Sequence, residues 1–155
     1  MKGGLAATSS VSSSASREEI ERSLCRYGAS DFGYMVNANR AVIAFAAPGR
    51  QVRFELLLPD PGAREFTHTP VRIEARTPTA RDAAYEQVIR QWWRALALIS
   101  NAKLEAFSSD VVEFESEFLA HIVLPGGQAV FDDVAPGIAA AYADGRVTPL
   151  LELVS

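Results

Sequence analysis

One long amphipathic segment, Asp82 to Phe107, constrains the fold of this chain more than any other feature. With successive residues set about 100° apart, its apolar side chains gather on one arc of a helix. The arc comprises Tyr85, Val88, Ile89, Trp92, Trp93, Leu96, Ile99, Ala106 and Phe107. A helix with such a face needs an apolar surface to cover it. We therefore expect Trp92, Trp93 and Leu96 to pack against a core or to form an interface.

Three strand candidates precede this helix and offer that surface. They span Phe32–Val36, Ala41–Ala47 and Gln51–Leu58, and short connections join them. Short connections favour antiparallel neighbours over parallel crossovers. A fourth strand is predicted at Val71–Arg76, where apolar and charged residues alternate. The pattern predicts an α+β fold, in which one long amphipathic helix covers a three- to four-stranded antiparallel meander.

The chain before the strands divides into a tail and a short helix. Residues 1–15 are rich in serine, alanine and glycine, which predicts a disordered tail. Ser16 and Glu19 have the spacing of a capping box, which indicates a helix start. The residues after them share one helical face and are followed by a terminating glycine, namely Ile20, Leu24, Tyr27 and Gly28. Residues 16–155 are expected to form a single domain.

The C-terminal part is expected to add further helices. Glu113–Val123 is predicted as a helix because apolar residues recur at helical spacing, and a strand through Val111–Phe114 is the alternative. Asp132 and Asp133 are expected to cap a last helix that runs to Gly145. The apolar segment Pro149–Val154 is expected to dock on the domain.

Composition points to a soluble protein of a reducing compartment. The 155-residue chain has one cysteine, which excludes an internal disulfide. No apolar run approaches the ~20 residues that a membrane-spanning helix needs. The first 16 residues lack the continuous apolar stretch of a secretory signal. These features predict a cytoplasmic location.

The net charge of -4 argues against adhesion to nucleic acid through the whole surface. Arginines nevertheless concentrate in the middle of the chain, whereas acidic residues dominate from Glu105 to Asp144. Six of these arginines flank the predicted sheet and helix and are candidate phosphate contacts: Arg50, Arg53, Arg72, Arg76, Arg90 and Arg94. Tyr34 or Phe66 would offer a surface for base stacking. Glutamates are interleaved with the arginines, so an ordinary surface of mixed charge is the alternative interpretation.

Catalytic and metal-binding patterns are not found. Cys25 lacks a nucleophile motif and is expected to be a buried or half-buried structural cysteine. His68 and His121 have no second histidine or cysteine at ligand spacing. A cluster of acids is better explained by a solvated face than by a magnesium site, namely Asp110, Glu113, Glu115 and Glu117. We therefore predict no catalytic residue, metal, cofactor or small-molecule substrate.

Lys103 is the residue that fits the helical pattern least. It falls in the middle of the apolar arc, between Ile99 and Phe107. One interpretation is that the arc leaves the sheet near the helix end, so that the amine reaches water and the last carbonyls. The other interpretation is a buried cation that faces an anion or a carboxylate partner.

Several segments have a familiar sequence: Ile20–Pro59, with its turn Arg26–Ala29 and its run Gly49–Leu56, then Arg90–Leu98, Ala102–Ala106 and Phe114–Gly127. Together they resemble a family of small uncharacterised proteins of tailed phages and prophages. The resemblance extends over nearly the whole chain after residue 16 and implies a phage context in a bacterial host, in the DNA-metabolism part of a genome. The predicted architecture also resembles the core of ring-forming single-strand annealing proteins of recombination.

Two functions follow as hypotheses. The first is a non-enzymatic accessory protein that binds single-stranded DNA as a homo-oligomer through the six arginines. The second is an adaptor or inhibitor of phage origin that binds another protein and no nucleic acid. The adaptor would use its apolar helix faces or its acidic C-terminal half as the docking surface.

Overall fold

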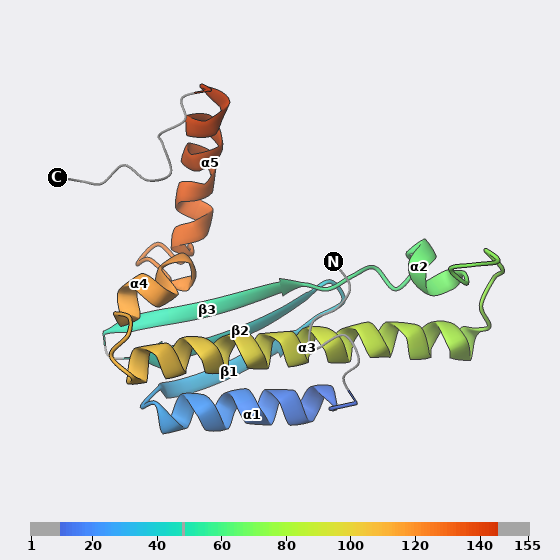
Figure 1. Cartoon of the computed structure of the whole chain (residues 1–155), viewed down its shortest axis with the longest axis horizontal. Coiled ribbons are helices and arrows are strands. Elements are labelled where there is room, and N and C mark those ends of the chain that lie inside the picture. Colours follow the sequence, from blue (N-terminus) through green and yellow to red (C-terminus); the bar gives the residue numbers. More distant parts are fainter. Residues whose placement is uncertain (1–9, 48, 146–155) are drawn as a thin grey trace.

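The computed structural model describes residues 10–47 and 49–145, and its elements follow one another as a helix, three strands and further helices (Figure 1). Their bounds are α1 (Ser13–Arg26), β1 (Ser30–Val36), β2 (Arg40–Ala47), β3 (Arg50–Leu57), α2 (Arg64–Thr67), α3 (Pro78–Ser108), α4 (Phe114–Phe118), the short 3-10 helix η1 (Leu119–His121) and α5 (Val130–Ala143). The predicted α+β class is confirmed.

The three strands form one antiparallel sheet in the order β1-β2-β3, as predicted. In this register Ile43 lies opposite both Tyr34 and Phe54. Side chains alternate between the two faces of a strand, so one face carries the buried Ala41, Ile43 and Phe45 of β2. The other face carries the intervening residues, which are partly or fully exposed.

The fourth strand predicted at Val71–Arg76 is wrong. Val71 is 89% exposed, and Ile73 has a φ of 54°, in the left-handed region that extended strands do not use. Within the described residues this segment makes a single β-bridge, between His68 and Ala75. The free edge of β3 is instead met by the chain after η1, where the Val123 amide donates to the Gln51 carbonyl at 2.8 Å.

Helix α3 covers the apolar face of the sheet, as its sequence predicts. Thr77 caps it by accepting a hydrogen bond from the Ala80 amide, and Pro78 occupies the first turn. Trp93 is 1% exposed and Leu96 4% exposed, whereas Trp92 is only partly buried. The core that these helices and strands share also contains Ile20, Leu24, Ile43, Phe45, Val52, Phe54, Leu104 and Phe118.

Helix α1 lies beside α3 and starts earlier than predicted (Figure 1). Ser12 is its cap and accepts a hydrogen bond from the Ala15 amide at 3.1 Å. The capping box at Ser16 and Glu19 is therefore wrong, and so is the boundary that assigned residues 13–15 to a disordered tail. Ser16 is fully buried because it lies one helical turn before Ile20 on the core face. Residues 1–9 lie outside the described residues.

The C-terminal part differs from its prediction in the bounds of its helices. The helix predicted over Glu113–Val123 shortens to α4, followed by η1, and the alternative strand over Val111–Phe114 does not form. Asp132 and Asp133 lie in the first turn of α5 rather than capping it, because the helix already begins at Val130. The segment Pro149–Val154 lies outside the described residues. None of the described helices has the length and hydrophobicity to cross a lipid bilayer.

Candidate interaction surfaces

Two of the six candidate arginines lie on β3 and connect it to the C-terminal part. Arg50 forms an ion pair with Glu115 of α4. Arg53 pairs with Glu55 at 2.8 Å and donates a hydrogen bond to the Gly127 carbonyl at 3.0 Å. Both guanidinium groups are thus already engaged by oxygen atoms of the protein.

The other four arginines are spread over the molecule. Arg94 pairs with Glu19 at 2.5 Å and so links α3 to α1. Arg90 donates to the Gln87 side chain, and Arg76 donates to the His68 carbonyl at 3.2 Å. Arg72 is exposed in the connection between α2 and α3, a segment that lies at the end of the molecule opposite the start of β3 (Figure 1). The structure therefore does not bring the six arginines into one groove.

The two aromatic residues considered for base stacking have different environments. Tyr34 is 54% exposed, and the Arg17 guanidinium lies 5.0 Å from the centre of its ring. Phe66 is only 2% exposed and packs against Tyr85, so it offers no stacking surface and that part of the expectation is wrong. Binding of single-stranded DNA stays a prediction.

Lys103 has a carboxylate partner. Its Nζ atom lies 2.8 Å from Glu117 Oε1 and 2.9 Å from the Glu117 carbonyl, and 5.8 Å from the centre of the Phe118 ring. The lysine and the glutamate side chains are 23% and 26% exposed. The geometry matches the interpretation of a cation facing a carboxylate, and the pair holds α4 against the end of α3.

His121 is held against the core beside this pair. Its ring centre lies 4.3 Å from that of Phe54. Burial lowers the pKa of His121 below 6.5, the charge of Lys103 lowers it further, and a hydrogen bond with the backbone of Arg53 opposes the change. The imidazole is therefore neutral at neutral pH. His68 lies in another part of the molecule, next to Thr67, whose Oγ1 is 2.9 Å from its Nδ1.

The remaining reactive groups do not converge on a site. Cys25 is exposed, contrary to the expectation of a buried or half-buried cysteine. Among the described residues no three His, Cys, Asp or Glu side chains are placed to hold a metal ion. A cavity of about 310 Å³ is lined mainly by apolar residues, with Arg50 and Glu115 as its charged members. These two groups neutralise each other, so the cavity offers space for an apolar group.

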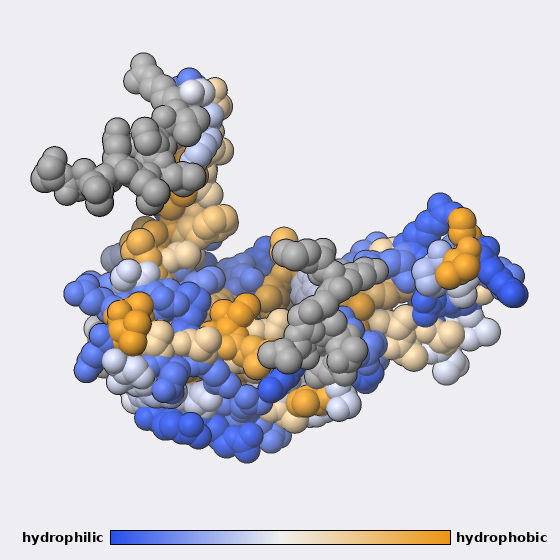
Figure 2. All heavy atoms as spheres, viewed as in Figure 1, coloured by the Kyte–Doolittle hydropathy of each residue, from blue (hydrophilic) through white to orange (hydrophobic). Residues whose placement is uncertain are grey.

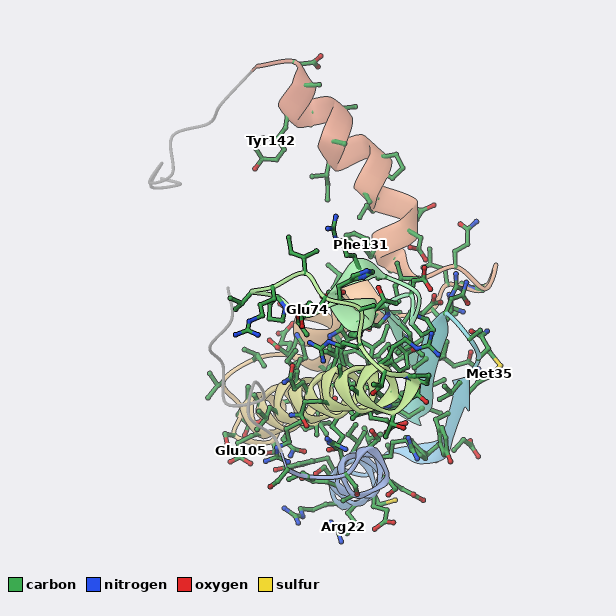
Figure 3. The ribbon with its side chains drawn as sticks, turned by 90° about the vertical axis from the view of Figure 1, so that its right-hand side faces the viewer. Arg22, Met35, Glu74, Glu105, Phe131 and Tyr142 are labelled. Carbon is green, nitrogen blue, oxygen red and sulfur yellow. The ribbon has the colours of Figure 1, made fainter. Side chains whose placement is uncertain are left out.

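Helix α5 is the most unusual surface of the described chain. It projects from the body, and Figure 2 shows apolar side chains at its base and along one side. None of its 14 residues is buried. Four large apolar residues follow one helical stripe and are well exposed: Phe131 57%, Val134 42%, Ile138 51% and Tyr142 76%. Figure 3 shows Tyr142 pointing into open space.

The sequence predicts a helix in the place of α5, but not that this helix leaves its apolar side chains exposed. The available signal was its composition, because Asp132 and Asp133 are the only charged residues between Val130 and Ala143. A helix that is apolar on most sides is normally buried. No pattern within the segment indicates that the rest of the described chain leaves it uncovered.

Comparisons with known proteins add no relative. No family model matches the chain, and neither the curated proteins nor the solved structures contain a match. The resemblance to phage proteins and the architectural resemblance to annealing proteins therefore remain expectations.

Proposed function

We propose that this protein is a non-enzymatic adaptor that acts by binding another protein chain through α5. One observation carries the proposal: a 14-residue helix that projects from the domain and exposes Phe131, Val134, Ile138 and Tyr142 along a single stripe. Large contiguous apolar patches on soluble proteins mark interaction sites. Aromatic residues such as Phe131 and Tyr142 also contribute strongly to binding energy at protein interfaces.

The intrinsic stability of α5 supports the need for a partner. Isolated helices shorter than about 12–15 residues are marginal in water. Pro136 lies inside the helix, where it removes one backbone hydrogen bond, and Gly137 follows it. Relative to alanine, interior proline costs about 3 kcal/mol and glycine about 1 kcal/mol. A helix with these two residues gains its stability from packing against another surface.

The charge of this region favours a protein partner over phosphates or a lipid surface. Residues 105–145 carry eight acidic side chains and no lysine or arginine. Phosphate groups of nucleic acids and anionic lipids would be repelled by such a surface. The surface that suits α5 is a groove with an apolar floor and a basic edge.

Site-specific photo-crosslinking in cells that express the protein tests the proposal. A photo-reactive phenylalanine analogue at Ile138 should give a discrete crosslinked product that mass spectrometry identifies as one protein. The matched control places the same analogue at Val71, which is 89% exposed and belongs to the connection between α2 and α3, at the end of the molecule away from α5 (Figure 1). That position should give no discrete product.

The crosslinking pattern decides whether α5 has a dedicated partner. A product with any single protein supports an adaptor that works through α5. Equal labelling from Ile138 and Val71, or labelling from neither, would mean that α5 has no dedicated partner and would overturn the proposal.

A further inference from the structure

The cavity of about 310 Å³ beside the core has the features of a ligand-binding site. It lies at the end of the sheet where the turn after α1, the β2–β3 hairpin, the end of α3 and α4 come together (Figure 1). Cavities of roughly 300–1,000 Å³ with mainly apolar and aromatic walls are typical of small-molecule sites. The segments that form it are distant in sequence, so no local pattern indicates this site.

The floor and walls of the cavity are apolar and largely aromatic. The floor consists of Phe45 and Leu104, which are 4% and 3% exposed. Tyr27, Phe107 and Phe114 also line the cavity and are partly buried. The rings of Phe107 and Phe114 meet edge to face, with their centres 5.4 Å apart. Four of the ten described residues that line the cavity are therefore aromatic, and a further aromatic ring packs well against such walls.

Small residues leave this space open. Gly28, Ala29 and Ala47 line the cavity with little or no side chain. Most protein interiors are filled by side chains and leave few voids larger than a water molecule. An apolar cavity of about 150 Å³ already binds benzene in another protein. About twice that volume accommodates two fused rings.

The charged residues lie at the mouth of the cavity. Arg50 and Glu115 are exposed and form an ion pair between β3 and α4. They are the only charged residues among the described ones that line the cavity. Their charges cancel, so the cavity offers no counter-charge to an ionised ligand. Because burial of an unpaired charge in an apolar site is costly, the cavity favours a neutral ligand.

We infer that this cavity binds a small neutral aromatic molecule of one or two rings, whose polar substituent faces Arg50 and Glu115 at the mouth. Phe107 and Phe114 belong to α3 and α4, so the ligand fills the space between these two helices. The inference goes beyond the proposed function and does not depend on it, because α5 contributes no residue to the cavity.

Titration of the purified full chain with indole, followed by heteronuclear NMR, tests the inference. Resonances of the residues that line the cavity should shift in a saturable manner. The expected Kd is below about 1 mM, which a neutral molecule of two fused rings can reach. Because indole would bind the folded chain and not the unfolded one, saturating indole should also raise the urea midpoint of unfolding.

Two neighbouring alanines of β2 supply a test variant and its matched control. Side chains alternate along a strand, so Ala47 shares the inward face of Phe45, whereas Ala46 lies on the outer face. Ala47→Leu fills the cavity, so it should abolish saturable indole binding without lowering the urea midpoint. Ala46→Leu adds the same side chain on the other face and should leave indole binding unchanged.

Other results would overturn the inference. The absence of saturable shifts would show that the cavity takes up no aromatic ligand, and preferential binding of 1-octanol would assign it to an alkyl chain. Equal indole binding by the wild type and Ala47→Leu would place the indole outside the cavity. If Ala47→Leu did not fold, the position of the shifted resonances in the wild type would still decide where indole binds. Crosslinking from Ile138 tests the adaptor proposal separately.

Discussion

Helices α3 and α5 carry the same kind of signal and end in opposite environments. Both have apolar stripes at helical spacing, yet Trp93 of α3 is 1% exposed whereas Tyr142 of α5 is 76% exposed. Helix α3 has a sheet beneath it and α1 beside it, so most of its stripe is covered within the chain, and Ile99, at 50% exposed, is the exception. Helix α5 starts from the edge of the same domain but points away from it (Figure 1). The comparison shows that an apolar stripe predicts packing against another surface, but does not indicate whether the same chain supplies that surface.

The largest expected difference between the two helices concerns stability. Trp93→Ala should lower the free energy of unfolding by about 3–5 kcal/mol, because it leaves a cavity in the core. Tyr142→Ala should change the stability of the dilute monomer by less than about 0.5 kcal/mol. Urea unfolding followed by circular dichroism measures both. Trp92→Ala is the matched control within α3 and should cost less than Trp93→Ala, since Trp92 is only partly buried. Equal losses from the two tryptophans would contradict this division.

The covered region was largely predictable from the sequence because its periodicities are set locally. Strands of period 2 and a helix of period 3.6 can be recognised without knowing their neighbours. The start of α1 could not be decided in this way, because Ser12 and Ser16 are equally capable caps. The core decides between them, since Ser16 lies on the same helical face as Ile20.

The segments that were mispredicted depend on partners distant in sequence. The alternation at Val71–Arg76 is typical of a strand, but the edge of β3 that it would need is partly met by Ile122 and Val123. The candidate phosphate contacts depended on arginines being free. Whether Arg50 and Arg94 are free depends on Glu115 and Glu19, which no local pattern connects to them. The exposure of α5 depends on packing in the same way.

A smaller effect on stability is expected for the ion pair between Lys103 and Glu117, which joins α3 to α4. Lys103→Met leaves the half-buried Glu117 carboxylate without its cation, which should cost about 1–3 kcal/mol. The control is Arg81→Met, which breaks a surface pair of 3.7 Å between Arg81 and Asp82 and should cost less than about 0.5 kcal/mol. Urea unfolding again provides the measurement. If both substitutions had the same small cost, the Lys103–Glu117 pair would not hold α4 to α3.

His121, which lies beside this ion pair, should make the free energy of unfolding depend on pH. The pKa of His121 is lowered on folding, so the unfolded chain binds its proton more readily than the folded chain. The contribution of His121 to the free energy of unfolding is therefore fully present above the unfolded pKa of 6.5, and it is lost as pH falls through the lowered folded pKa. His121→Gln should therefore lose less stability than the wild type when pH falls below 6.5, and urea midpoints across that range measure the difference. An unchanged pH dependence in His121→Gln would mean that its burial does not oppose protonation.

The smallest expected effect concerns the arginines around the covered helix. Because five of the six have partners within the protein, we expect no measurable binding of a fluorescent single-stranded oligonucleotide even at low salt. Arg72→Gln, at an exposed position, should change neither stability nor this result. Fluorescence anisotropy at increasing salt provides the measurement.

Measurable binding of the oligonucleotide would instead show that these arginines contact phosphates. If the oligonucleotide bound and log affinity fell with log salt by about 0.7 per neutralised phosphate, arginines would be leaving their carboxylate partners for phosphates. Loss of about one such contact in Arg72→Gln or Arg90→Gln would locate the surface. Retention of binding in Ile138→Asp would show that α5 does not contribute to it. The arginine-bearing surface would then bind nucleic acid, and α5 would serve assembly alone.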